Sequence, residues 1–193
     1  MRYLWILLIP VISSCVVVPN YQYIKGGARV TQPGVTFVLP KTKSWVAILR
    51  STYEAAFGAS RMPRHESLIV AMRVYNMPSV SDKQDFLEYI KQKRESGPKT
   101  GRFEKIRNQQ ALYPDRTEMC VVHQSASKDF GRDAKRGGDY SVFETYGMNC
   151  RHPLKPQVGI FIELSRKAPP ATDFSEFETM AQKLLKSVKF VGF

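Results

Sequence analysis

The sequence predicts an α+β fold, in which an antiparallel sheet has one internal helix and one C-terminal helix packed on it. Three observations predict this fold. Several segments alternate apolar and polar residues, as half-buried strands do. Two other segments repeat apolar residues at helical spacing. The links between the later strand-like segments are rich in Gly, Pro, Asp and Lys, which is typical of hairpins.

The first part of the folded body is predicted to consist of strands. Residues 35–39 alternate and end at Pro40. Residues 45–50 and 52–59 are expected to form two strands or one long bent strand. Residues 66–75 carry apolar side chains at every second position, which also predicts a strand.

The internal helix is predicted to begin at a capping box. The Ser81 hydroxyl can accept the amide of Gln84, and the Gln84 side chain can reach back. Apolar residues then recur at helical spacing to about Arg94. The Gly-Pro pair at 97–98 is expected to end the helix.

Four further strands are expected near 102–112, 118–125, 140–150 and 158–165. A last helix should begin after the prolines at 169–170, capped by Thr172 or Asp173. Its apolar stripe requires a sheet to pack on and comprises Phe174, Phe177, Met180, Ala181, Leu184, Leu185 and Val188.

This order of elements resembles the PsbP/Mog1-like sandwich, in which early strands precede a helix, a meander follows and a C-terminal helix closes the fold. The resemblance covers most of residues 35–190. That fold includes photosystem accessory subunits and binders of small GTPases, so the resemblance implies an architecture and no particular function.

The N-terminal residues 1–14 have the order of an export signal: a charged start, a short apolar run and two small residues. The apolar run is well below the roughly 20 residues that span a bilayer, so we expect no permanent transmembrane helix.

The end of this segment, Ile12-Ser13-Ser14-Cys15, resembles the lipobox of bacterial lipoproteins. The resemblance implies that the Cys15 sulfur receives a diacylglycerol, that cleavage follows before Cys15, and that acyl chains such as palmitate anchor the protein. Val16 follows, and the absence of Asp there favours the outer membrane, facing the periplasm. The alternative is a secreted protein without an anchor.

Residues 15–34 contain two prolines and three glycines without helical period, so we expect a lipidated tether there. The single α+β domain is expected to occupy residues 35–193.

The chain is basic: 29 Lys and Arg against 17 Asp and Glu give a net charge of +12. Such a charge attracts polyanions. For an exported protein, an anionic lipid, a glycan or an acidic envelope protein is expected rather than nucleic acid. The densest basic stretch is the candidate anion or partner surface, and the alternative is a solvated face. It comprises Lys91, Lys93, Arg94, Lys99, Arg102, Lys105 and Arg107.

A second basic group lies in a predicted loop and comprises Lys128, Arg132, Lys135 and Arg136.

Two cysteines besides Cys15 lie in neighbouring predicted strands, at 120 and 150. An even pair in an exported chain favours a disulfide between Cys120 and Cys150. The alternative is a zinc site that adds His123 and His152. The spacing opposes zinc, because residues three apart in a strand, such as Cys120 and His123, face opposite sides.

The segment 147–153 has the pattern G-x-x-C-x-H-P. Together with the Cys-Val pair at 120–121, it resembles a group of small uncharacterised lipoproteins. The resemblance spans roughly residues 102–165 and implies kinship rather than a chemistry.

The sequence contains no nucleophile elbow, Walker loop, G-x-G-x-x-G or H-E-x-x-H motif. It supports no catalytic residue, cofactor or metal. We therefore expect an envelope-anchored lipoprotein with a non-catalytic binding or assembly role. The alternative is an envelope enzyme or metal-handling protein that uses His152 and its neighbours.

Overall fold

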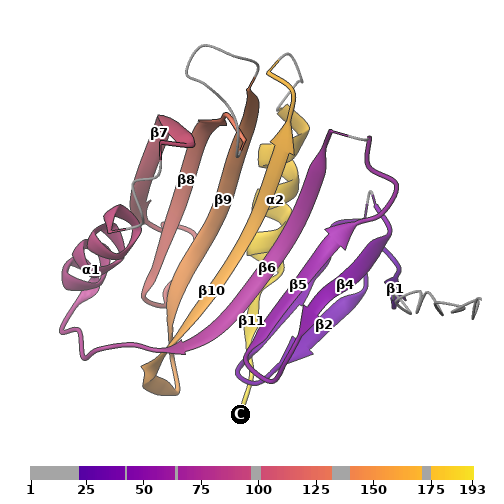
Figure 1. Ribbon diagram of the computed structural model, residues 1–193. Coiled ribbons are helices and arrows are strands. Elements are labelled where there is room, and N and C mark those ends of the chain that lie inside the picture. The colour runs from indigo at the N-terminus through magenta and orange to yellow at the C-terminus, as the bar shows by residue number, and fades with distance from the viewer. Residues whose placement is uncertain (1–21, 42, 64, 97–100, 132–139, 171–174) are drawn as a thin grey trace, which may run out of the picture.

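The computed structural model describes residues 22–41, 43–63, 65–96, 101–131, 140–170 and 175–193. Within them, two sheets and two helices form a layered sandwich (Figure 1). The elements in chain order are β1 (Tyr23–Ile24), β2 (Arg29–Gln32), β3 (Val35–Val38), β4 (Trp45–Arg50), β5 (Glu54–Ala59), β6 (Ser67–Asn76), α1 (Lys83–Glu95), β7 (Phe103–Leu112), β8 (Cys120–Asp129), β9 (Ser141–His152), β10 (Lys155–Ala168), α2 (Ser175–Ser187) and β11 (Lys189–Phe190).

The large sheet has the strand order β1-β4-β5-β6-β10-β9-β8-β7, and all its described pairings are antiparallel. Strands β6 and β10 are far apart in sequence and lie side by side at its centre. The small sheet has the order β11-β3-β2. The predicted fold class, an antiparallel sheet with an internal and a C-terminal helix, is confirmed.

One face of the large sheet carries the main core. Alternate residues of its central strands, such as Met72, Met148 and Ile162, are at most 2% exposed there. Helix α2 and the small sheet cover this face (Figure 1) and contribute Leu184 and Phe37 to the same apolar cluster. Burial of these side chains supplies the main stabilisation of the fold.

The opposite face carries α1, which covers only the region near β7 and β8 (Figure 1). Phe86, Leu87 and Ile90 pack there against Val121 and Met77 in a second, smaller cluster. The rest of this face has no helix over it in the described part of the chain.

The predicted cap of α1 was wrong by one residue. Asp82 is the N-cap, and its carboxylate accepts the amides of Gln84 and Asp85 at 2.8 and 2.9 Å. Ser81 instead bonds the Asp85 side chain. A charged acceptor near the positive end of the helix dipole is favoured over a hydroxyl.

The predicted tether 15–34 was too long, because the folded body includes residues 23–34. Strand β2 pairs with β3, and Val30 is buried in the main core. Pro33 and Gly34, which we interpreted as linker residues, form the turn of this hairpin, where Gly34 has a φ of 79°. Pro and Gly mark tight turns as well as linkers, and only pairing distinguishes the two.

The signal and lipid-attachment residues 1–15 lie outside the described residues, and so do the predicted caps Thr172 and Asp173. No helix within the described ranges has the length and apolar character needed to cross a membrane.

Candidate functional site

The described residues of the predicted basic surface point in different directions. Lys91 pairs with Glu88 at 2.9 Å, and Arg102 pairs with the buried Asp129 at 2.6 Å. Lys105 and Arg107 lie exposed on the edge strand β7. They flank a register shift that leaves Lys105 opposite Ser127 and Arg107 opposite Ala126, on different faces of the sheet. Lys99 lies outside the described residues.

The remaining two residues of that stretch, Lys93 and Arg94, point from α1 toward the large sheet. The Lys93 ammonium lies 3.8 Å from the centre of the Tyr75 ring. The Arg94 guanidinium lies 3.5 Å from a carboxylate oxygen of Glu163 and 3.4 Å from the Thr145 hydroxyl. Neighbouring cations of this stretch therefore have different surroundings, because helix periodicity turns them in different directions.

The second basic group is only partly described. Lys128 pairs with Glu104 at 2.7 Å across β7 and β8. Arg132, Lys135 and Arg136 lie outside the described residues.

The cysteines at 120 and 150 face each other directly in the β8–β9 register and are joined by a disulfide with a Cα–Cα distance of 4.1 Å. Both sulfurs are in the main core. His123 lies on the opposite face of β8, beside α1. The four residues of the zinc alternative therefore do not meet, and no cluster of metal ligands occurs among the described residues.

His152 is a structural contact between the two sheets. Its Nε2 lies 3.1 Å from the carbonyls of both Gly34 and Val191, and its Nδ1 accepts the Leu154 amide at 3.2 Å. The aromatic rings of Phe190 and Phe193 pack against it. Both ring nitrogens are thus engaged, so the alternative in which His152 binds a metal or substrate is not supported by its geometry.

A different histidine lies at the centre of a polar cluster. His123 on β8 and Glu163 on β10 both pair with Gly147 on the intervening strand β9. Because Gly147 has no side chain, His123 Nε2 reaches Glu163 Oε2 at 2.9 Å across it. A Cβ at Gly147 would lie only 2.6 Å from His123 Nε2.

The hydrogen bonds around His123 form a chain of donors and acceptors that leads from Tyr75 through Asn149 and His123 to Glu163. The Tyr75 hydroxyl donates to Asn149 Oδ1 at 3.2 Å, and Asn149 Nδ2 lies 3.5 Å from His123 Nδ1. The opposite nitrogen, Nε2, then donates to Glu163. The Phe161 ring stacks on His123, with 5.9 Å between ring centres. This pattern fits a neutral His123 with its proton on Nε2.

The electrostatics agree with that assignment. Burial lowers the pKa of His123, although the hydrogen bond and charge of Glu163 oppose this effect. For Glu163, burial would raise the pKa, but the hydrogen bond from His123 and the charge of Arg94 outweigh it and lower the pKa. The pair is therefore a neutral imidazole donating to a carboxylate at neutral pH.

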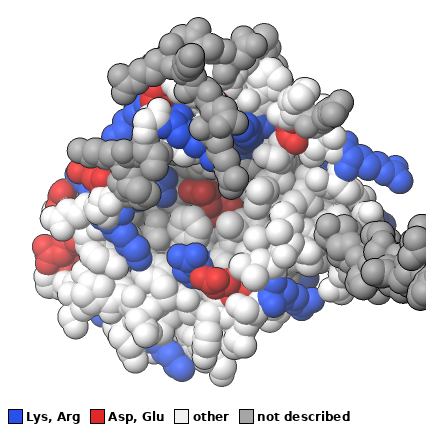
Figure 2. All heavy atoms as spheres, in the orientation of Figure 1, with Lys and Arg blue, Asp and Glu red and all other residues white. Residues whose placement is uncertain are grey.

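A small pocket of about 150 Å³ opens beside this cluster, lined in part by Tyr75, Asn149 and Phe161. Three cations, Arg73, Lys93 and Arg94, also line it. Arg94 Nε is buried without a hydrogen-bond partner among the described residues. Figure 2 shows this face, with acidic atoms deep in a hollow and Lys and Arg atoms around it.

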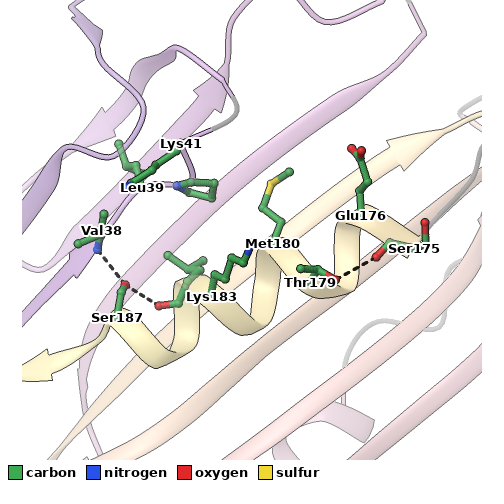
Figure 3. A pocket seen from close by; sticks show the side chains of 11 residues that line it. Val38, Leu39, Lys41, Ser175, Glu176, Thr179, Met180, Lys183 and Ser187 are labelled. Carbon is green, nitrogen blue, oxygen red and sulfur yellow. Dashed lines mark hydrogen bonds between the residues drawn. The ribbon is translucent and has the colours of Figure 1, made fainter.

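A larger cavity of about 790 Å³ lies on the other side of the molecule, between α2 and the end of β3 (Figure 3). Leu39, Met180 and Leu184 give it a mainly apolar lining, with Lys41 and Lys183 at its border. Residues 42 and 171–174, next to its lining residues in sequence, lie outside the described residues. The small pocket adjoins the polar cluster around His123 and three cations line it, so it is the better candidate site.

The polar cluster could not be found from the sequence, because strand register alone brings together residues 40 positions apart. One signal was present. Gly147 interrupts a predicted strand, and a glycine inside a strand often marks a close approach of other groups.

No protein-family model matches the chain, and a search of curated proteins finds no relative. Among solved structures, the chain is similar to the Ran-binding protein Mog1 of Saccharomyces cerevisiae, with 10% identity and a TM-score of 0.47. The match covers 90% of this chain and 96% of that one. A mutant form of Mog1 matches with 12% identity and the same TM-score, covering 90% and 97% of the two chains. Both are structures of the Mog1 type that the order of elements resembles, and such a likeness concerns the arrangement of elements alone.

Proposed function

We propose that the protein is an envelope lipoprotein, held at a membrane by acyl chains on Cys15, whose folded body has a non-catalytic binding role. The partner presents an acidic side chain to the small pocket beside α1. The lipobox supports the anchor, and the pocket geometry supports the mode of binding.

The observation that carries the binding role is the convergence of cations on a pocket of about 150 Å³. Ligand sites for small molecules usually measure about 300–1,000 Å³, so this pocket suits a single side chain. Arg73 and Arg94 already pair with Glu54 and Glu163. Lys93, held over Tyr75, and the Nε of Arg94, which has no partner in the part of the chain that the structure describes, leave donors for one further carboxylate.

The bonding of His123 favours binding over catalysis. A general base needs a free nitrogen within reach of the proton that it removes. His123 is about 1% exposed, and both its nitrogens face other side chains. Within the described residues, no hydroxyl or thiol is bonded to it. The cluster therefore serves to fix Arg94 and the pocket floor in place.

The proposal is tested by crosslinking the tagged full-length protein in intact cells and identifying captured proteins by mass spectrometry. Lys93→Glu should reduce capture of the partner about tenfold, because it places a carboxylate where the partner's carboxylate would lie. Lys91→Glu is the matched control, because Lys91 lies on the same helix but pairs with Glu88.

The binding role is contradicted if no envelope protein is captured, or if capture is the same for both variants. The anchor is tested separately by metabolic labelling with a palmitate analogue, which Cys15→Ser should abolish.

A further inference from the structure

Exposed apolar side chains gather at one end of the large sheet. Tyr23 on β1 is 71% exposed, and Ile48 and Leu49 on β4 are 59% and 47% exposed. Tyr53, in the turn that follows β4, is 56% exposed. Scattered single residues of this kind are ordinary on a protein surface, whereas a contiguous group of them indicates an interaction site.

The strand register places Tyr23, Ile48 and Leu49 on one face. Tyr23 lies opposite Val46, and Val46 lies opposite Gly58. Ile48 is the extra residue of a β-bulge between Ala47 and Leu49, and its side chain lies over Gly58. This is the face of the sheet that carries α1 at its far end. In Figure 2, the part of that face over β4 and β5 is mainly white, with Lys and Arg at its border.

The surrounding segment is strongly basic. Residues 22–63 contain one acidic residue, Glu54, which pairs with Arg73. Six basic residues accompany it in this segment, Lys25, Arg29, Lys41, Lys43, Arg50 and Arg61, of which Lys41 borders the cavity on the other side of the molecule. An apolar and aromatic patch bordered by Lys and Arg is the pattern of surfaces that bind an anionic bilayer.

The chain enters the folded body at this patch. The Gln22 carbonyl accepts the amide of Ala47, the residue before Ile48, at 3.3 Å. Cys15 precedes Gln22 by seven residues, and seven extended residues span at most about 25 Å. An anchor on Cys15 would therefore hold this end of the sheet close to the bilayer and raise its effective concentration there.

We propose that the end of the large sheet formed by β1, β4 and β5 docks onto an anionic phospholipid surface, with Tyr23, Ile48 and Leu49 at the headgroup level. This inference rests on the lipid anchor proposed above. It orients the body, because β1 and α1 lie at opposite ends of the sheet (Figure 1), with the docked end and the pocket beside α1 on the same face.

The test places an environment-sensitive fluorophore on Ile48→Cys in the full-length acylated protein, reconstituted in vesicles of phosphatidylethanolamine and phosphatidylglycerol. Since Cys15 is acylated and the other two cysteines are bonded to each other, the new thiol is free. Ile106→Cys is the matched control: Ile106 is 54% exposed and lies at the bulge of β7, at the opposite edge. Leu49→Cys repeats the measurement at a second position.

Docking predicts that a lipid-borne nitroxide quenches the fluorophore at 48 and 49 but not at 106. In vesicles of phosphatidylcholine alone, the equilibrium constant for docking should fall about fivefold for each basic residue in contact with the surface. Equal quenching at 48 and 106 in acylated protein overturns the docking and leaves the anchor intact.

Mass spectrometry of the same preparation reports the anchor independently. A protein without acyl chains on Cys15 overturns both the anchor and the docking that rests on it. In intact cells, a fluorophore at 48 that is shielded from water but not quenched by lipid-borne nitroxide identifies a protein partner at this patch, which also overturns docking on lipid.

Discussion

The two faces of the large sheet differ in what covers them and in what they contain. The face under α2 and the small sheet is apolar, and its side chains belong to one continuous core. The face under α1 is covered only in part and carries a polar cluster of His123, Glu163, Asn149 and Thr145. The same strands build both faces, because successive side chains point to opposite sides.

This difference shows how one sheet can bury an apolar core on one face and hold a fixed polar cluster on the other. The apolar face gains from every methylene removed from water. The polar face needs each buried group to find a partner, which fixes the orientation of its side chains rather than adding much net stability. Mutations on the two faces should therefore have effects of different size and kind.

The largest effect is expected on the apolar face. Ile162→Ala should lower the free energy of unfolding by about 2–5 kcal/mol, because Ile162 is fully buried and its loss leaves a cavity. Ile69→Ala, on the opposite face and only half-buried, should cost clearly less. Urea denaturation of both variants measures the difference, and equal losses would remove the distinction between the faces.

A smaller effect is expected from Gly147→Ala on the polar face. The added methyl group would lie 2.6 Å from both His123 Nε2 and the Ile162 carbonyl. We expect a loss of about 1–3 kcal/mol and separation of His123 from Glu163. The control is Gly101→Ala, where nothing lies within 4 Å of the added atom. If the NMR chemical shifts of the His123 ring are the same in this variant as in the unmodified protein, the close approach of His123 to Gly147 is contradicted.

The smallest effect is a dependence of stability on pH. Burial lowers the pKa of His123 below its ordinary value of 6.5, so the unfolded chain binds a proton more readily there than the folded protein does. Stability should therefore fall as the pH decreases from about 7 to about 5. Below that window, Glu163 and Asp129, whose pKa values are also lowered, add to the loss.

His123→Gln should reduce the fall between pH 7 and 5, because the variant has no group that titrates at this position. Urea denaturation of both proteins across this range isolates the contribution of His123. A fall of equal size in both proteins would assign the pH dependence to other groups.

Local patterns in the sequence were sufficient to predict most of the helices and strands. The alternation of residues 66–75 and the helical spacing after residue 82 correspond to β6 and α1 within one or two residues. The stripe that includes Phe177 and Leu184 correctly predicted that α2 packs on a sheet. These predictions succeed because the period of apolar residues reflects which face each element buries.

Local patterns failed where a residue has two possible roles. Pro33 and Gly34 suit a linker or a hairpin turn, and pairing between β2 and β3 decides for the turn. Lys93 and Lys91 are the same residue type two positions apart, yet one lies over Tyr75 and the other pairs along the helix. The difference arises from the position of α1 on the sheet.

The sequence by itself determined the fold class, the order of the elements, the basic charge and the expectation of a lipidated Cys15. The tertiary structure decided which distant residues meet: His123 with Glu163 across Gly147, and the apolar residues of β1 with those of β4. The physical reason is that periodicity reports the direction of a side chain within its own element, whereas contacts between elements depend on strand order and register.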